Sequence, residues 1–564
     1  MKKIFLIFAM FLLTFAVFAD GKKKFAEVSA KHKEEAFKTL DQTFLDVKSL
    51  IADNDDREKL SAAVTKIQSL YKNKKLIESA KEDSDVFEDA KSRKQVAPAG
   101  VLCYAEASNT GRERSKMNEK KNSAGLRFWI LVWGLGLIGQ LVWNIENQWF
   151  NTFVYAKIAK DPTIISWMVA ISAIATTVST FVFGTLSDRG GRRKPFVTLG
   201  YVLWGIFTIL FGTTEFITAG KGGDTARLLV LAAAAVVLAD ALMSFFGSMG
   251  NDAGFNAWHN DNMNDRHRSA IGAALATQPI LGTIVGVVVG GMLIGESDNY
   301  MRLFVAEGGL AIVFGLLAFL FMKDAPTLTP NRQGSFFRQL LGGFDFRALA
   351  KRKELLWVLL VVCVYFIGFN VYYPHVGNYM IYYLGFSADD IGLIQGIALL
   401  LGMLSVIPAS MLLNRNKFVP AAALAVLLSL VGVGMLGLVG RPENVDVSTI
   451  WNWNLLIALF FFGCGYIMFM QVTSVWMKQL FPQEAKGQFE GFRIVFFVLI
   501  PWVVSPFIAN PIIKRNGQIL DQDGLPAYLP THVLFLISTA LILLTLLPLF
   551  FAARHRRARL EAES

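Results

Sequence analysis

Cysteine is scarce in this chain, with three residues among 564, and two of them, Cys363 and Cys464, lie in apolar segments. Such a sequence predicts no disulfide framework. No spacing of His, Cys and carboxylate side chains is typical of a zinc site, and no Gly-rich loop is of the kind that cradles nucleotide phosphates. We therefore expect no bound metal, no cofactor, no transport driven directly by ATP and no enzymatic activity.

Charged residues are also few, at 18% of the chain against 54% hydrophobic residues. This composition is typical of proteins that cross a membrane several times. The net charge of +11 concentrates in short loops on one side, which indicates membrane orientation and not nucleic-acid binding. We expect a multi-pass monomer of the inner (cytoplasmic) membrane, whose partners are the lipid bilayer and a small-molecule solute.

The N-terminal region differs from the rest of the chain. Residues 1–19 are typical of a secretory signal peptide, because Lys2 and Lys3 precede an apolar run and a small-residue cleavage site. Residues 20–95 predict a soluble helical segment, and residues 96–123 a linker. A working signal would place the cation-rich loops described below on the outer side. Either residues 1–19 do not translocate the chain, or the first hundred or so residues are an upstream reading frame and Met117 begins the carrier.

From Leu126 onward, apolar segments follow one another, each long enough to cross a hydrocarbon core of about 30 Å as a helix. We predict twelve spans, at 127–154, 163–185, 195–215, 227–250, 270–294, 302–322, 355–376, 388–413, 418–440, 452–477, 490–513 and 531–552. Lys and Arg gather in the even-numbered loops, which places both ends of this region on the cytoplasmic side. The longest loop, residues 323–354, separates residues 124–322 from residues 355–553, and residues 554–564 form a cytoplasmic tail. Within that loop, 336–349 suits a helix on the membrane surface.

The loop between the second and third spans has the pattern G-x-x-x-D-R-x-G-R-R, from Gly184 to Arg193. An ordinary cation-rich turn would need no Gly or Asp at these places. The pattern closely resembles the loop between helices 2 and 3 of the major facilitator superfamily. The resemblance covers about residues 124–555 and implies an all-α membrane protein of twelve transmembrane helices in two six-helix bundles, which rock about a central site.

The resemblance also implies that the loop is a conformational latch, whose Asp meets helix 11 when the carrier is open to the outside. The residues concerned are Gly184, Asp188, Arg189, Gly191, Arg192 and Arg193, with Glu490 as a candidate partner. It further implies that helices 5 and 8 meet across the two halves. Gly282, Gly286 and Gly290 in the fifth span, and Gly392 and Gly396 in the eighth, are then expected to form a sliding surface.

Amide side chains recur along one face of the first span: Gln140, Asn144, Asn147 and Asn151, with Trp143 on their flank. At ~100° per residue the four amides lie within a stripe of about 60°. Amides donate and accept hydrogen bonds at once, and aromatic rings cover apolar C–H surface, so this face suits a neutral, hydroxyl-rich solute. The alternative is that the amides join neighbouring helices.

Two acidic residues lie within spans, Asp240 near the middle of the fourth and Glu146 in the first. A carboxylate in the membrane is costly unless it is paired, protonated or bound to a cation. Both are therefore candidate ion-coupling residues. A structural pairing remains the alternative for Asp240, and a position at the outer mouth of the carrier for Glu146.

The stretch from Asn251 to Asp261 resembles, more weakly, the end of helix 4 in the glycoside–pentoside–hexuronide:cation symporters and related sucrose-type carriers. The paired helix-2 acids of that branch, associated with sodium, are absent from Ile164–Phe183, which favours protons as the coupling ion. Further candidate substrate-binding residues are Asn251, Asn256, Asn370, Tyr373, Gln471 and Trp476.

These features together predict a secondary active transporter that moves a small hydrophilic solute, a sugar or a glycoside, by proton-coupled symport. A proton-driven exporter of amphipathic compounds is one alternative. A membrane receptor or scaffold that does not transport is the other.

Overall fold

The computed structural model describes residues 126–218, 225–263, 268–295, 298–332, 334–342, 346–481, 491–520 and 526–563. The predictions for residues 1–123 and for Glu490 lie outside these ranges. Twelve of the described helices are long and apolar enough to cross a membrane, which confirms the twelve predicted spans. Their ends differ from the predicted ones by a few residues, as at the first span, which runs from Arg127 to Ile158.

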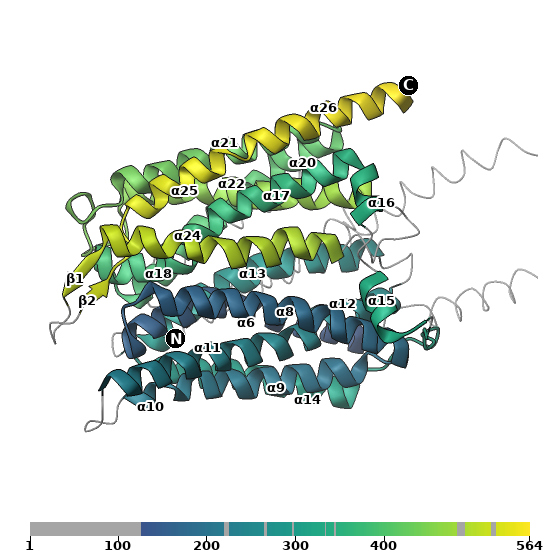
Figure 1. The fold of residues 1–564 in the computed structure, drawn as a ribbon, viewed down its shortest axis with the longest axis horizontal. Coiled ribbons are helices and arrows are strands. Elements are labelled where there is room, and N and C mark those ends of the chain that lie inside the picture. The colour runs from purple at the N-terminus through teal and green to yellow at the C-terminus, as the bar shows by residue number, and fades with distance from the viewer. Residues whose placement is uncertain are drawn as a thin grey trace, which may run out of the picture. The chain divides into compact units, whose positions relative to one another are not determined.

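The first six spans form one half of the molecule (Figure 1). Their elements are α6 (Leu126–Ile145), η1 (Glu146–Phe150), α7 (Asn151–Phe153), η2 (Val154–Ile158), α8 (Pro162–Gly190), α9 (Lys194–Thr213), α10 (Glu215–Thr218), α11 (Thr225–Ser248), η3 (Met249–Phe255), α12 (Asn256–Asp261), α13 (Arg268–Ile294) and α14 (Tyr300–Phe321).

The other six spans form the second half, separated from the first by α15 (Phe336–Gly342) and α16 (Phe346–Lys351). Their elements are α17 (Lys353–Tyr372), η4 (Tyr373–His375), α18 (Val376–Asn378), η5 (Tyr379–Leu384), α19 (Ala388–Gly402), η6 (Met403–Ser405), α20 (Val406–Asn414), α21 (Phe418–Val439), η7 (Pro442–Asn444), α22 (Trp453–Leu480), η9 (Val495–Leu499), α24 (Ile500–Asn516), α25 (Val533–Leu543) and α26 (Leu546–Glu563).

Within the surface helix expected over 336–349, the structure describes helix in α15, up to Gly342, and in α16, from Phe346. Two other details were not expected from the sequence. A short antiparallel hairpin, β1 (Gln518–Leu520) with β2 (Pro526–Tyr528), follows the eleventh span. The tail beyond residue 553 continues α26 as one helix to Glu563.

The two halves meet along α13 against α19 and along α8 against α24. The glycine patterns contribute to only one of these seams. Gly392 of α19 faces the backbone of Val287 and Val288 on α13. Gly282 of α13, however, faces Gln140, and Gly290 faces Trp149, so this row packs on the first span. The expectation that the fifth-span glycines slide on the eighth span is therefore wrong for these two residues.

One end of the structure carries the loop at Asp188 and the other carries Asp161, before the second span; we call these the Asp188 end and the Asp161 end. Hydrogen bonds join the halves at the Asp161 end. The Asn378 side-chain amide donates to the main-chain oxygen of Asn151 (3.0 Å), and the Ser166 hydroxyl donates to that of Pro506 (3.0 Å). The main-chain N–H of Tyr528 donates to the oxygen of Lys160 (2.8 Å). The Asp161 end is therefore closed in this structure.

Candidate functional site

Glu146 lies at the centre of a polar cluster inside the first half. Its Oε1 accepts hydrogen bonds from the Ser244 hydroxyl (2.8 Å) on α11 and the Ser172 hydroxyl (3.1 Å) on α8, and these two hydroxyls are 2.6 Å apart. The side chain of Asp240, one turn from Ser244 on α11, interacts with Ser172 as well. Three spans thus bring two carboxylates and two hydroxyls together.

Both acids are deeply buried, since Glu146 is 9% exposed and Asp240 is 1% exposed. Among the residues that the structure describes, no Lys, Arg or His forms an ion pair with either. Asp240 Oδ1 and Glu146 Oε2 have no hydrogen-bond partner there. The electrostatic interaction between the two acids is repulsive. A second negative charge would therefore be strongly opposed, so at least one proton or other cation is required for both to stay in place.

The chain around Glu146 departs from regular α-helix. Residues 146–150 form the π-helical turn η1, and residues 154–158 form a second one, η2. The seventh span is interrupted in the same region, by the 3₁₀ turn η4 and the π-helical turn η5. Such irregular turns inside spanning helices frequently lie at functional sites, because they turn main-chain polar groups and side chains toward a cavity.

The amide stripe of the first span turns partly onto its own helix. The amides of Asn144, Asn147 and Asn151 each donate to the carbonyl oxygen four residues earlier, at 2.7, 2.6 and 2.9 Å. The Asn144 oxygen also accepts from Thr283 of α13 (2.7 Å). Gln140 is half-buried against Gly282, and the Trp143 ring lies 4.9 Å from that of Trp204. Local hydrogen bonds thus hold the three Asn side chains through their amide nitrogens, and their side-chain oxygens can accept from other groups.

Unpartnered polar atoms gather where the first span meets the seventh. The atoms without a hydrogen-bond partner are Gln148 Nε2, Asn151 Oδ1, Asn378 Oδ1 and both ring nitrogens of His375, and these four side chains are buried. Asn370, in α17, is fully buried and neither of its side-chain polar atoms has a partner. Buried polar groups are nearly always satisfied, so this interface indicates a place that water or a polar ligand occupies.

A small cavity of about 60 Å³ lies beside these residues. Most of its lining comes from the second half, including Tyr372, Tyr373, Tyr466 and Phe462, and Thr283 and Val287 of α13 complete it. Gln395 lines it too and donates to the sulfur of Met380 (3.4 Å). Solute sites commonly enclose ~300–1,000 Å³, so this cavity is too small for a sugar while the Asp161 end is closed.

The remaining substrate candidates lie apart from this interface. Asn251 is buried against the first span, where its oxygen accepts from the Tyr201 hydroxyl (3.0 Å). Asn256 is exposed and contacts His259. Gln471 donates to Ser410 (2.8 Å).

Trp476 is fully buried and donates to Glu354 Oε1 (2.9 Å) at the start of the seventh span. Of the second-half substrate candidates, Tyr373 lines the cavity that Thr283 and Val287 of the first half complete.

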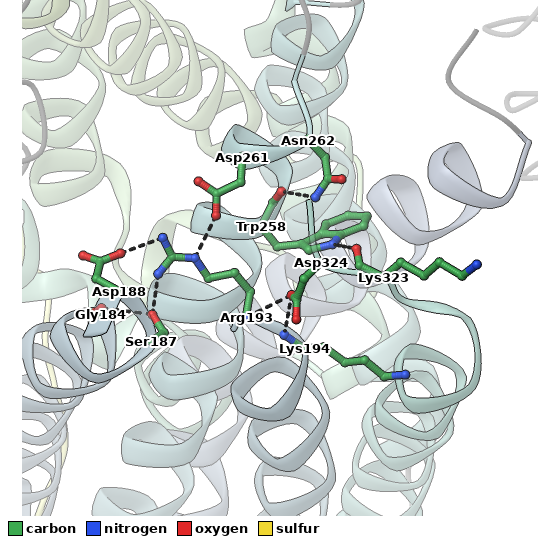
Figure 2. A network of polar contacts seen from close by, with 10 residues as sticks. All are labelled: Gly184, Ser187, Asp188, Arg193, Lys194, Trp258, Asp261, Asn262, Lys323 and Asp324. Atoms are coloured by element: carbon green, nitrogen blue, oxygen red, sulfur yellow. Dashed lines mark hydrogen bonds and ion pairs between the residues drawn. The ribbon is translucent and has the colours of Figure 1, made fainter. Parts of the chain in front are cut away.

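The latch loop forms a dense network centred on Arg193 (Figure 2). Its guanidinium pairs with Asp188 (2.6 Å) and Asp261 (2.8 Å) and donates to the Ser187 hydroxyl (2.6 Å). Burial alone would lower the pKa of Arg193, but the hydrogen bond to Asp261 and the charge of Asp188 raise it above its usual value. Arg193 therefore stays charged and ties the ends of the second and fourth spans together.

Residues of the segment between the sixth and seventh spans hold the rest of the loop in place. Asp324 accepts hydrogen bonds from the main-chain N–H groups of Arg193 (2.9 Å) and Lys194 (3.0 Å), at the first turn of α9. Gly191 has φ +60°, a conformation that favours glycine, and a Cβ there would meet Pro330. Arg189 donates to Gln339 of α15 (3.0 Å). Gly184 accepts from Ser187 (2.9 Å). Arg192 is exposed. In this structure Asp188 pairs with Arg193, and the predicted contact with helix 11 stays a prediction.

Sequence reasoning missed two further acids within the spans, one buried and one half-buried. Glu307 in the sixth span is 2% exposed, and neither of its carboxylate oxygens has a hydrogen-bond partner. Asp252 in η3 accepts from Ser248 (2.5 Å) and Asn251 (3.1 Å), and it interacts electrostatically with Arg493 of the eleventh span. The rule that selected Asp240, an acid within an apolar span, would have selected Glu307 as well.

Comparisons with known proteins agree with this architecture. The family model of the Major Facilitator Superfamily matches residues 132–506 and 358–563. The crystal structure of a D-xylose-proton symporter superposes with a TM-score of 0.56 and 14% identity, over 75% of this chain and 97% of that one. The nucleoside transporter NupG superposes with a TM-score of 0.52 and 13% identity, over 75% of this chain and 98% of that one.

A curated relative from Arabidopsis thaliana, the protein ZINC INDUCED FACILITATOR 1, is 27% identical over 180 residues, which are 32% of this chain. The match spans 33% of that relative's length. The family model, in contrast, covers most of the described residues in both halves of the molecule. The chain therefore belongs to the Major Facilitator Superfamily.

Proposed function

We propose that this chain is a proton-coupled symporter for a small hydrophilic solute, a sugar or a glycoside. The observation that carries the proposal is the pair Glu146 and Asp240, buried together around Ser172 and Ser244 with no cationic partner among the described residues. A proton neutralises a carboxylate without any further ligand. Loss of that proton to the cytoplasm would change the charge balance of the first half.

Solute recognition is assigned to the interface of the two halves. Asn147, Gln148 and Asn151 of the first span offer donors and acceptors, and we assign Asn370 and Tyr373 of the seventh span to the same site. Ring hydroxyls of a sugar match amides, while its C–H face or an aromatic aglycone matches the tyrosines. The D-xylose-proton symporter and the nucleoside transporter NupG share this fold, and their solutes are polar ring compounds, which is consistent with the proposal.

The closed Asp161 end is consistent with the proposed alternating access. With about 60 Å³ of space at the interface, a solute of sugar size enters only when the halves separate on one side. The contacts between Asn378 and Asn151 and between Ser166 and Pro506 must then break as the Asp161 end opens. Protonation of the Glu146–Asp240 pair can bias this equilibrium only if the two states bind the proton with different affinities.

The test is uptake into proteoliposomes from a panel of D-xylose, sucrose, an aryl glycoside and uridine. An inward proton gradient is expected to drive accumulation of at least one of them, and a sodium gradient is not. Asp240→Asn is expected to abolish gradient-driven accumulation but to keep counterflow, because exchange needs no net proton movement. Asp446→Asn, a change in an exposed loop, is the matched control. Full accumulation by Asp240→Asn would remove this residue from the coupling role.

The apolar, tyrosine-lined cavity favours a second candidate, proton-driven export of amphipathic compounds. Outward movement of an aryl compound against its gradient, without uptake of any sugar, would favour export. Absence of flux and counterflow for every compound, in correctly folded protein, would instead favour a receptor or scaffold.

A further inference from the structure

Glu307 of α14 is a buried carboxylate that the proposed pair does not include. It is 2% exposed, and both of its oxygens lack a hydrogen-bond partner among the described residues. Its neighbours along α14 are Gly308, whose backbone closely approaches Gly205 of α9, and the Phe304 ring one turn away. Tight packing of α9 against α14 leaves no room for the side chain to reach water on that side.

Glu307 lies at the same depth as Glu146. Phe150, one turn beyond Glu146, packs on Phe304 with ring centroids 5.0 Å apart, and α6 and α14 run in opposite directions. The two carboxylates therefore lie at a similar depth in the bundle, and Glu307 interacts electrostatically with Glu146. Glu146 in turn interacts with Asp240, so it stands between the other two acids.

The other elements packed on α14 supply no countercharge at this depth. α14 packs on α9, α6 and α13. On α9 the ionisable side chain nearest in sequence to Gly205 is that of Tyr201. It lies beside Gly315, about two turns from Glu307 along α14, and its hydroxyl donates to the main-chain oxygen of Leu135 (2.7 Å). The ionisable group of α6, Arg127, is at the Asp188 end, where it bonds to Phe321. Described residues of α13 beyond Arg268 carry no ionisable side chain.

A proton fits this position better than a metal ion. No group of three His, Cys, Asp or Glu side chains within the described ranges has the spacing of a metal site. A metal ion would need several oxygen ligands, whereas a carboxylate in apolar surroundings is neutralised by one proton. Neither oxygen of Glu307 has a hydrogen-bond partner among the described residues that would fix the proton in one place.

We propose that Glu307 is a second proton-binding site of the carrier, which exchanges its proton with the Glu146–Asp240 pair. The inference deepens the proposed proton coupling and rests on it for its role in transport. Three carboxylates in one bundle then hold two exchangeable protons, and a cycle that empties both sites moves two protons for each solute.

Infrared difference spectroscopy of the full-length protein in lipid tests this without any solute. The C=O stretch of protonated carboxyl groups is followed from acidic to alkaline pH. We expect Glu307→Gln to remove one titrating component, and Asp240→Asn or Glu146→Gln to remove a different one. Glu443→Gln, which changes an exposed carboxylate, is expected to leave the buried-carboxyl signal unchanged. Ser244→Ala removes the hydrogen bond that Ser244 donates to Glu146. It should therefore shift the Glu146 component and, through it, the pH at which Glu307 titrates.

Loss of no component in Glu307→Gln would overturn the second site and leave the proposed function standing. If Glu307→Gln removes a titrating component but neither Asp240→Asn nor Glu146→Gln does, the proposed coupling pair would be wrong. If Glu307→Gln does not fold, Glu307→Asp serves, since a shorter acid keeps the carboxyl but moves it away from Glu146. An unchanged titration in that variant would also overturn the proposal.

Discussion

Lys514 of the eleventh span pairs with Asp161 at the start of the second, with 3.2 Å between Nζ and Oδ1, and so joins the two halves at the Asp161 end. The same carboxylate accepts a hydrogen bond from the main-chain N–H of Thr163 (2.8 Å) and caps α8. Lys514 also lies over the ring of Tyr528, which is bonded to Lys160. One ion pair thus connects helix capping with closure.

Asp161→Asn separates these two roles, because Asn keeps the cap and loses the charge. Both side chains are 36% exposed, so we expect the pair to stabilise closure by less than about 1 kcal/mol. The result should be an up to ~5-fold faster labelling, from the Asp161 end, of a cysteine placed at Val376 in a background without native cysteines. Arg441→Gln, which breaks a pair within one loop, is the control. An equal increase in that control would contradict the interpretation.

Gly377 makes a tight contact across the closed end. A Cβ at this position would lie 2.5 Å from Thr152 Cγ2 and 3.1 Å from Gln148 Nε2. Thr152 is fully buried and its hydroxyl is bonded to Trp149 (2.9 Å), so it has little room to move. We expect Gly377→Ala to disfavour closure by about 1–3 kcal/mol, and thus to raise the same cysteine labelling more than Asp161→Asn does.

Two variants test the steric origin of that effect. Thr152→Ser removes the clashing methyl group and keeps the hydroxyl, so Gly377→Ala with Thr152→Ser should label at close to the parent rate. Gly309→Ala adds a methyl group where no atom lies within 4 Å and should change nothing. Failure of Thr152→Ser to restore closure would mean that the added methyl group acts elsewhere.

The twelve spans were predictable because apolar length alone determines which segments can cross a bilayer. The loop at Asp188 was also predictable as a family signature, because its Gly and charged residues occur at the spacing of that signature. Its contacts were not, because Asp324, which holds the N-terminus of α9, comes from more than a hundred residues further along the chain.

Side-chain partners within the membrane were the least predictable feature. A polar residue in a span can face a cavity, another helix or its own backbone, and periodicity does not distinguish these. Asn144 and Asn147 donate hydrogen bonds to the backbone of their own helix, and Trp476 donates one to Glu354. Glu146 and Asp240 lie 94 positions apart, and the packing of the first span against both α8, through Ser172, and α11, through Ser244, brings them together.

The latch network gives a prediction for stability. Arg193→Gln would leave Asp261 and Asp188 without their shared cation, and Ser187 without its donor. Asp188 is 47% exposed and can be hydrated, so we expect a loss of about 1–3 kcal/mol, seen as a lower Tm of the purified protein. Arg192→Gln, at an exposed neighbouring position, is the matched control and should melt as the parent does. Equal melting of both variants would contradict a stabilising role for the network.

The C-terminal helix anchors the second half through one buried acid. Glu354 is 6% exposed; its Oε1 lies 3.3 Å from Arg556 Nη1, and its Oε2 lies 2.7 Å from Arg559 Nε. Arg556 also lies over the Phe418 ring and donates to the main-chain oxygen of Asn416 (3.3 Å), in the loop between the eighth and ninth spans. This loop lacks the Gly and Asp of its counterpart at Asp188, and Arg556 of α26 bonds to it instead.

Removing one partner of a buried pair costs more than removing both, because a lone buried charge stays behind. We expect Arg556→Gln with Arg559→Gln to destabilise the protein by up to about 3–5 kcal/mol, reduced by the partial exposure of Arg559. Adding Glu354→Gln should restore most of that loss, since Gln can still accept from Trp476. Thermal melts of the parent, the double arginine variant, Glu354→Gln alone and the triple variant form a double-mutant cycle, with the exposed Arg554→Gln as control. A triple variant that melts no higher than the double arginine variant would show that the arginines stabilise the fold through contacts other than Glu354.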